Sequence, residues 1–369
     1  MKKTALRWLP AVGVPVVVIA AAITVPAFAE TSPTLPAKSA SEVLQLVADS
    51  DVTAYSGTLE QRSDLGLPEL PAMRGSDSSG DTVSSALELL TGSHTARVFV
   101  GGADTSRVQV MDTLAERDVV KNGSDVWLYS SDANEATHVV LDKDIESGEA
   151  APQTTATPAE ITQKLLDSLD PTTTVTVSDT AKVAGRSAYS LTLTPKSGET
   201  LVGSVTVSVD SETGLPLGVI VTASGSDSPA FSVTFSSIDF ATPDPALFVF
   251  TPPAGATVTE APESTSDVPN AEGTDGDTGD HPRPIVTGKG WDAIVELPAG
   301  SAPVAEGNTE GAAEPGSDAT AILEQLTVEV PEGRVVQTSL VSVLFATDGR
   351  IFAGAVSAEQ LQAAARAAE

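Results

Sequence analysis

Strict alternation of apolar and polar residues constrains the fold of this chain more than any other feature of its sequence. Tyr189, Leu191 and Leu193, for example, alternate with serine and threonine, and a period of two places such apolar side chains on one face of a β-strand. Turn sequences such as Asn122-Gly123 separate the alternating segments, and connections this short join antiparallel neighbours. About eleven strands are predicted in this way, at 56–63, 95–102, 106–113, 115–123, 125–131, 135–141, 174–183, 187–195, 203–210, 216–225 and 229–240.

Two helices accompany these strands. Residues 39–51 have apolar side chains at helical spacing, and residues 157–171 begin with Thr157 as N-cap and Glu160 as the partner in a capping box. Two helices, each roughly 10 Å in diameter, cover less than half of a sheet about 50 Å across. The apolar face of the sheet must therefore curl upon itself. The sequence predicts an α+β fold, an antiparallel β-barrel of about eleven strands that is either fully closed or half-open, with helices closing an apolar cavity.

Apolar side chains on the inward faces of these strands are the candidates for lining the cavity. The strand at 125–131 is apolar on both faces, with Val126 and Leu128 on one side and Trp127 and Tyr129 on the other, so we expect it to be covered on its outer side as well. The candidates are Tyr55, Leu59, Val98, Val108, Trp127, Tyr129, Tyr189, Leu191, Val205, Val207, Phe231 and Phe235.

The first 29 residues are set apart from the rest of the chain. Lys2, Lys3 and Arg7 precede a long apolar run that ends in an Ala-x-Ala sequence at 27–29, as in a secretory signal peptide. The run is also about long enough to span a bilayer, so residues 1–29 are either a cleaved signal or an uncleaved anchor that contacts the membrane. Either reading predicts an extracytoplasmic protein, secreted or attached to the outer face of the cytoplasmic membrane.

Composition divides the remainder of the chain into three parts. Residues 39–254 hold the predicted half-barrel. Residues 255–288 are dominated by Gly, Pro, Ser, Thr and acidic residues, a composition typical of a disordered linker. Residues 289–369 contain a predicted hairpin turned by Asp348-Gly349 and a final helix, which together predict a small C-terminal α+β module.

The charge of the exported part excludes some partners. Without residues 1–29, 17 basic and 50 acidic residues remain, a net charge of −33. Such a surface repels nucleic acid and anionic lipid headgroups, which are bound mainly through Lys and Arg. We therefore expect no nucleic-acid partner, and any lipid must be held through apolar contact. The chain has no cysteine, so disulfides and thiolate metal sites are excluded.

Catalysis and metal binding have little support in the sequence. The three histidines are His94, His138 and His281, and the last lies in the linker. Acidic residues at 274–280 lack the spacing of an EF-hand calcium loop, and no nucleophile elbow or phosphate-binding loop occurs. We expect a protein without catalytic residues, metal or cofactor.

Several segments, in order along the chain, resemble the outer-membrane lipoprotein carrier family (LolA-like), which also includes envelope-stress regulators. The similarity covers about residues 39–258. That family has a half-open barrel of antiparallel strands, with helices closing an apolar cavity. The segments that resemble it are YSGTLEQ (55–61), VKNGSDVWLYSSDANEATH (120–138), VAGRSAYSLTLTP (183–195), VDSETGLPLGVIV (209–221) and FSSIDFATPDPALFVFTPPAGATV (235–258).

The resemblance implies two alternative functions. One is a carrier that holds the acyl chains of a lipid or lipoprotein in its cavity. The other is an envelope sensor of the anti-sigma-factor type, which binds a protein partner and responds to lipid. An uncleaved anchor at residues 8–29 favours the sensor, because a tethered protein cannot travel far.

Overall fold

The computed structural model describes seven stretches of the chain, residues 35–67, 92–111, 115–141, 157–167, 171–261, 284–299 and 326–368. The expected signal or anchor at 1–29 lies outside these residues, as does 262–283 of the expected linker. Within the stretches described, no helix is long and apolar enough to cross a bilayer.

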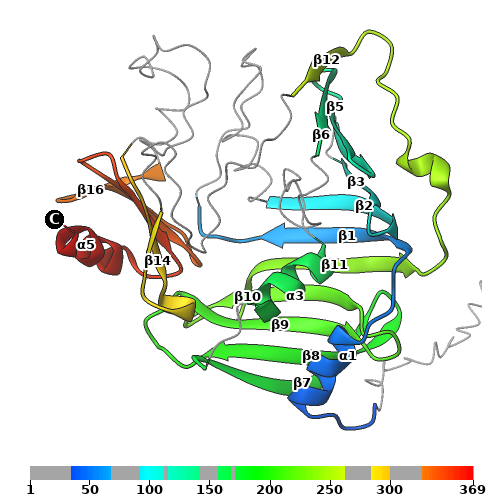
Figure 1. The fold of residues 1–369 in the computed structure, drawn as a ribbon. Helices are drawn as coiled ribbons and strands as arrows, with labels where there is room; N and C mark the ends of the chain where they lie inside the picture. The colour runs from blue at the N-terminus through cyan, green and yellow to red at the C-terminus, as the bar shows by residue number, and fades with distance from the viewer. Residues whose placement is uncertain are drawn as a thin grey trace, which may run out of the picture. The chain divides into compact units, whose positions relative to one another are not determined.

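Twelve strands form one large sheet in the order β12-β6-β5-β4-β3-β2-β1-β11-β10-β9-β8-β7 (Figure 1). The strand nearest the N-terminus, β1, lies in the middle, paired with both β2 and β11. Among the described strands β12 and β7 have one neighbour each, so the sheet is open. The strands are β1 (Tyr55–Ser63), β2 (Gly92–Gly102), β3 (Thr105–Met111), β4 (Glu116–Asn122), β5 (Asp125–Ser130), β6 (Glu135–Val140), β7 (Thr173–Val183), β8 (Arg186–Pro195), β9 (Val202–Asp210), β10 (Pro216–Ala223), β11 (Pro229–Asp239) and β12 (Thr257–Glu260).

The strand count differs from the prediction by one. Each of the eleven predicted segments forms a strand, and these strands pair with antiparallel neighbours. The twelfth strand, β12, lies inside the expected linker 255–288 and pairs parallel with β6. Its sequence, Thr-Val-Thr-Glu, has only one apolar residue, so nothing in its own pattern distinguishes it from the surrounding loop. The linker also holds β13 (Ile285–Thr287).

Two helices begin where the sequence places them. In α1 (Ala40–Ala48) Ser39 is the N-cap of a capping box. Ahead of α3 (Pro158–Asp167) the backbone N–H of Thr157 donates to Glu160 Oε2 at 2.7 Å. Both helices lie on the same face of the large sheet, α1 over β7 and β8 and α3 over β10 (Figure 1). We call this the inner face and the opposite one the outer face.

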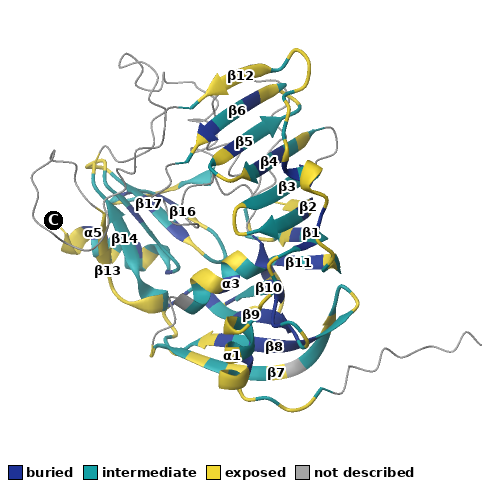
Figure 2. Ribbon diagram, turned by 45° about the vertical axis from the view of Figure 1, so that its right-hand side comes forward, coloured by how far each residue is buried: buried dark blue, intermediate teal, exposed yellow. Residues whose placement is uncertain are grey.

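The main hydrophobic core lies between the helices and the inner face. Val43 of α1 is fully buried there, and it packs among the inward side chains of β1, β2 and β8–β11. Buried residues concentrate in these strands, as Figure 2 shows. On the outer face, hydroxyl groups occupy the alternate positions, and Thr192 Oγ1 lies 3.3 Å from Thr206 Oγ1. The alternation in the sequence therefore corresponds to one packed face and one polar face along β8 and β9.

A second, six-stranded antiparallel sheet follows in the order β13-β14-β18-β17-β16-β15. One helix, α5 (Ala358–Ala367), packs on it and starts with a capping box between Ser357 and Gln360. Leu344, Phe352 and Leu361 are among its fully buried side chains. The remaining strands of this sheet are β14 (Ile294–Leu297), β15 (Val328–Val330), β16 (Gly333–Gln337), β17 (Ser342–Ala346) and β18 (Ile351–Gly354).

Direct contacts join the two sheets. The indole Nε1 of Trp291 donates to Thr173 Oγ1 of β7 at 2.8 Å, and the backbone N–H of Leu201 donates to the carbonyl oxygen of Ala355 at 2.8 Å. Trp291 and Ala355 also pack against the main core. The C-terminal sheet therefore shares part of its apolar surface with the large sheet.

Candidate functional site

Ten of the twelve predicted cavity residues lie on the inner face. Eight of them are at most 5% exposed and belong to the main core. Val108 and Phe231 are partly buried against that core. The eight buried residues are Tyr55, Leu59, Val98, Tyr189, Leu191, Val205, Val207 and Phe235. Because they are packed against other protein atoms, these eight hold the fold together.

Trp127 and Tyr129 require a correction, since they lie on the outer face. Their cross-strand partners on β4 are Val120 and Asp118, and Leu128 between them points to the inner face. A strand that is apolar at every position gives no sign of which side is inward, because alternation alone carries that information. The expected outer cover is present: the ring of Phe250 lies 5.4 Å from that of Trp127 and 5.7 Å from that of Tyr129.

The inner face continues beyond the part that the helices cover. Val108, Val119 and Leu128 are cross-strand partners on β3, β4 and β5, so they form one row across the sheet, which we call the open row. The row extends from Val98 of the main core. All three side chains of the open row are only partly buried, whereas α1 and α3 make their main contacts with β7, β8 and β10. The open row is therefore the accessible continuation of the apolar core.

The open row ends in polar and charged positions. Thr137 of β6 follows Leu128 in register. Along β4 the inward neighbours of Val119 are Arg117 and Lys121, and Lys121 Nζ lies 3.4 Å from the carbonyl oxygen of Ala103. An apolar strip bounded by polar groups is a common arrangement for holding the hydrocarbon part of an amphiphile.

Tyr55 joins the core to the start of α3. Burial raises the pKa of Tyr55 to about 12, and the nearby Glu160 carboxylate adds to the effect, while a hydrogen bond with Thr157 acts in the opposite direction. Both main causes disfavour a phenolate in this position. The phenol is therefore a neutral group fixed between β1 and the first turn of α3.

We expect alkaline titration to show this burial directly. Phenolate absorbance should include a step near pH 12, where Tyr55 ionises. The variant Tyr55→Phe should lose this step, and the control Tyr129→Phe should retain it. A single step for all three tyrosines near the ordinary value of about 10 would contradict the burial of Tyr55.

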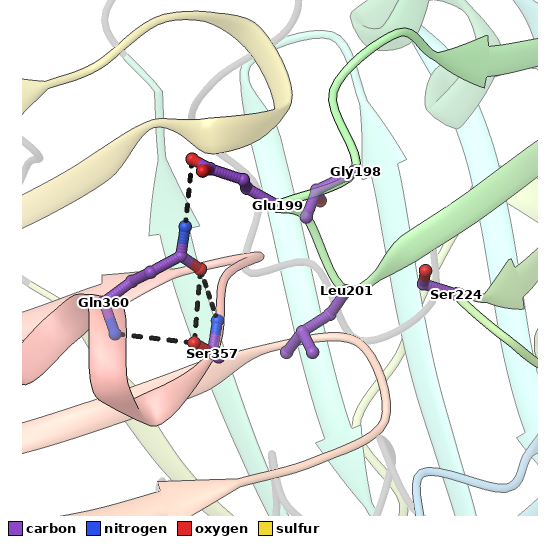
Figure 3. Close-up of a pocket in the computed structure, with 7 residues that line it drawn as sticks. Gly198, Glu199, Leu201, Ser224, Ser357 and Gln360 are labelled. Carbon is purple, nitrogen blue, oxygen red and sulfur yellow. Dashed lines mark hydrogen bonds between the residues drawn. The ribbon is translucent and has the colours of Figure 1, made fainter.

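A hollow of about 470 Å³ lies away from the open row. Its lining includes Glu199 after β8 and Ser357 and Gln360 at the start of α5, and Gln360 Nε2 donates to Glu199 Oε2 at 3.5 Å (Figure 3). None of the twelve predicted residues lines it. The hollow is open, and its lining mixes polar groups with apolar surface.

The candidate groups for catalysis are separated. His94 is on the inner face of β2, opposite Gln61, and His138 is on the outer face of β6, opposite Trp127. His281 and residues 274–280 lie outside the described residues. Within the parts of the chain that the structure describes, no cluster of three or more His, Asp or Glu side chains is arranged to hold a metal ion.

Comparisons with known proteins find solved structures of low sequence identity. No family model matches the chain, and no curated protein matches it. A solved complex of MucA and MucB from Pseudomonas aeruginosa matches with 15% identity and a TM-score of 0.45, over 88% of this chain and 96% of that one. A LolA superfamily protein from Nitrosomonas europaea matches with 12% identity and a TM-score of 0.25, over 58% of this chain and 99% of that one.

A third solved structure adds to the same group. An outer membrane lipoprotein-sorting protein domain from Vibrio parahaemolyticus matches with 12% identity and a TM-score of 0.24, over 56% of this chain and 94% of that one. The solved structures that match this chain therefore include a LolA superfamily protein, a lipoprotein-sorting domain and MucB, the group that its sequence motifs resemble.

Proposed function

We propose that this protein is an extracytoplasmic carrier that holds the acyl chain of a lipid or lipoprotein against the inner face of its open sheet and catalyses no reaction. One observation carries the proposal: the open row of Val108, Val119 and Leu128 continues the apolar core beyond α1 and α3 and is only partly buried. Exposed apolar surface is costly in water, and each buried methylene group contributes about 0.8 kcal/mol. An acyl chain lying across β3, β4 and β5 would supply that burial.

The overall charge suits an apolar ligand. The acidic surface of the chain repels anionic membranes, so attraction must come from hydrocarbon contact. The polar ends of the open row allow a headgroup to remain in water while the chain is covered. Release to an acceptor then needs no chemical step, only a more favourable apolar site elsewhere.

Binding of a dansyl-labelled fatty acid tests the proposal. We expect Leu128→Asp to weaken binding at least about tenfold, because it places a charge in the apolar strip and removes about 1.5–3 kcal/mol of side-chain burial. The measurement is probe fluorescence titrated with folded protein. Val140→Asp is the matched control, because Val140 is 37% exposed on the outer face of the neighbouring strand β6, and it should leave binding unchanged.

Two outcomes would contradict the proposal. In the first, folded wild-type protein binds no probe. In the second, Leu128→Asp and Val140→Asp weaken binding equally, which would place the probe elsewhere. Circular dichroism of both variants shows whether the fold is kept.

An envelope sensor that binds a protein partner is the second candidate. The observation that favours it is the pair of edge strands in the small sheet, which expose Ile285, Val286 and Val328. Exposed apolar edges are places where a strand of another chain can add. Native mass spectrometry of protein isolated from the cell envelope separates the two functions, since a carrier retains an acyl lipid and a sensor retains a protein in fixed stoichiometry.

A further inference from the structure

The chain returns across the outer face after β11. This return segment, residues 245–261, starts with the 3-10 helix η1 (Pro245–Phe248) and ends with β12 and Ala261. Arg107 Nη1 of β3 donates to the carbonyl oxygen of Leu247 at 3.2 Å. The buried ring of Phe248 lies where Gly101 has no side chain, since a Cβ there would be 2.6 Å from the ring. The first half of the return segment is therefore fixed by packing.

The second half of the return segment contains β12 and is held mainly by backbone hydrogen bonds rather than by packing. All four side chains of β12 are exposed, so burial contributes little to holding this strand. Its attachment to β6 is made by backbone hydrogen bonds, including Thr257 N–H to Asn134 O at 3.0 Å and Ala261 N–H to His138 O at 2.8 Å. Elements with so few buried apolar contacts open at low free energy, so a further contact would stabilise β12.

His138 makes that contact. Its Nδ1 lies 2.8 Å from Glu260 Oε2 of β12, and its Nε2 lies 2.9 Å from Asp125 Oδ1 of β5. The imidazole stacks on the indole of Trp127, with ring centroids 4.3 Å apart and planes at 14°. A neutral imidazole has one N–H, whereas the imidazolium has two. Only the protonated ring donates to both carboxylates at once.

We infer that the imidazolium of His138 is a latch that fixes β12 to the edge of the large sheet, and that the latch loosens when His138 loses its proton. Without β12, the backbone N–H and C=O groups of β6 would form the edge of the sheet and become available to a strand of another chain. This inference does not depend on lipid binding at the open row.

The direction of the pH effect follows from the surroundings of the ring. Burial lowers the pKa of His138, but its hydrogen bonds to Glu260 and Asp125 and the charges of both outweigh that effect, so the pKa is raised above 6.5. Those two carboxylates are the charged groups that face the ring from β12 and β5. The stabilisation is fully present below the unfolded pKa of about 6.5 and is lost as the pH rises through the raised folded value.

Hydrogen–deuterium exchange of the full chain tests the latch. We expect the protection factors of the Thr257 and Ala261 amides to fall about threefold between pH 6 and pH 8.5, a size typical of a partly exposed ion pair. The amide of Leu141, which donates to Ser124 O at 2.8 Å outside the return segment, should keep its protection. Protection factors already remove the intrinsic dependence of exchange on pH.

Two variants complete the experiment. Glu260→Gln keeps a hydrogen-bonding group but removes the charge, and at 68% side-chain exposure it should not disturb folding. In this variant the protection at Thr257 and Ala261 should be low at both pH values. The control Glu212→Gln removes a carboxylate that pairs with Arg186 far from the latch, and it should behave like the wild type. Unchanged protection across the pH range, or the same pH dependence in Glu260→Gln, would overturn the inference.

Discussion

Replacing Phe235 with alanine is expected to lower the free energy of unfolding by about 3–5 kcal/mol, the usual cost of removing a buried aromatic ring from a packed core. Phe235 is 2% exposed on β11, and its ring meets that of Tyr55 edge to face at 5.9 Å. Gly57 of β1 also adjoins the ring, because a Cβ there would approach within 2.8 Å of it. The surroundings cannot collapse into the space, because β1 and β11 are already paired there.

Urea unfolding followed by circular dichroism measures this loss. Phe231→Ala is the matched control, since Phe231 is on the same strand and face but only partly buried. This variant should lower the free energy of unfolding by clearly less than Phe235→Ala. Equal losses for the two variants would show that the region around Phe235 is not closely packed.

Asp210→Ala is expected to lower the free energy of unfolding by about 3–5 kcal/mol, because it leaves the guanidinium of Arg186 without its buried partner. Asp210 is fully buried at the end of β9. It accepts hydrogen bonds from Arg186 Nε at 2.7 Å and from the backbone N–H and hydroxyl group of Thr213 at 2.9 and 2.6 Å. Glu212→Gln is the control, because Glu212 also contacts Arg186 but is 78% exposed, and it should cost less than about 1 kcal/mol.

The cost of Asp210→Ala should depend on pH. Burial raises the pKa of Asp210, but the hydrogen bonds from Arg186 and Thr213 outweigh it and hold the pKa below its usual value. A carboxylate with a lowered folded pKa stabilises the protein above the unfolded value of about 3.9 and loses that effect as the pH falls through the folded value. Unfolding measured at neutral and acidic pH should therefore show the difference between wild type and variant narrowing in acid.

The strands of the large sheet could be predicted from the sequence because each carries its own signal. In β8, Tyr189, Leu191 and Leu193 alternate with hydroxyl residues, and the structure has those three buried. The strand β12 carries no such signal, because its position depends on β6, a distant and parallel partner. The local sequence pattern of a strand does not show which remote strand it pairs with.

The candidate site could be predicted only in part for a related reason. The alternation identified Val108 as inward but gave no preference for Leu128 over Trp127 on β5. The cross-strand register with Val119 resolves that choice, and register is a property of the pair of strands. The latch could not be predicted from the sequence either. Asp125, His138 and Glu260 come from three strands, and they meet only after β12 has paired with β6.

The position of β1 in the middle of the sheet has a consequence for how the molecule assembles. The neighbours within β2–β6 and within β7–β11 are close in the chain, so each group can form as a series of hairpins, whereas the seam between β1 and β11 brings Ser56 opposite Asp239. Contacts between such remote residues form slowly. We therefore expect the seam to form late, and two incomplete molecules that meet before it forms would be able to exchange halves there, giving a swapped dimer.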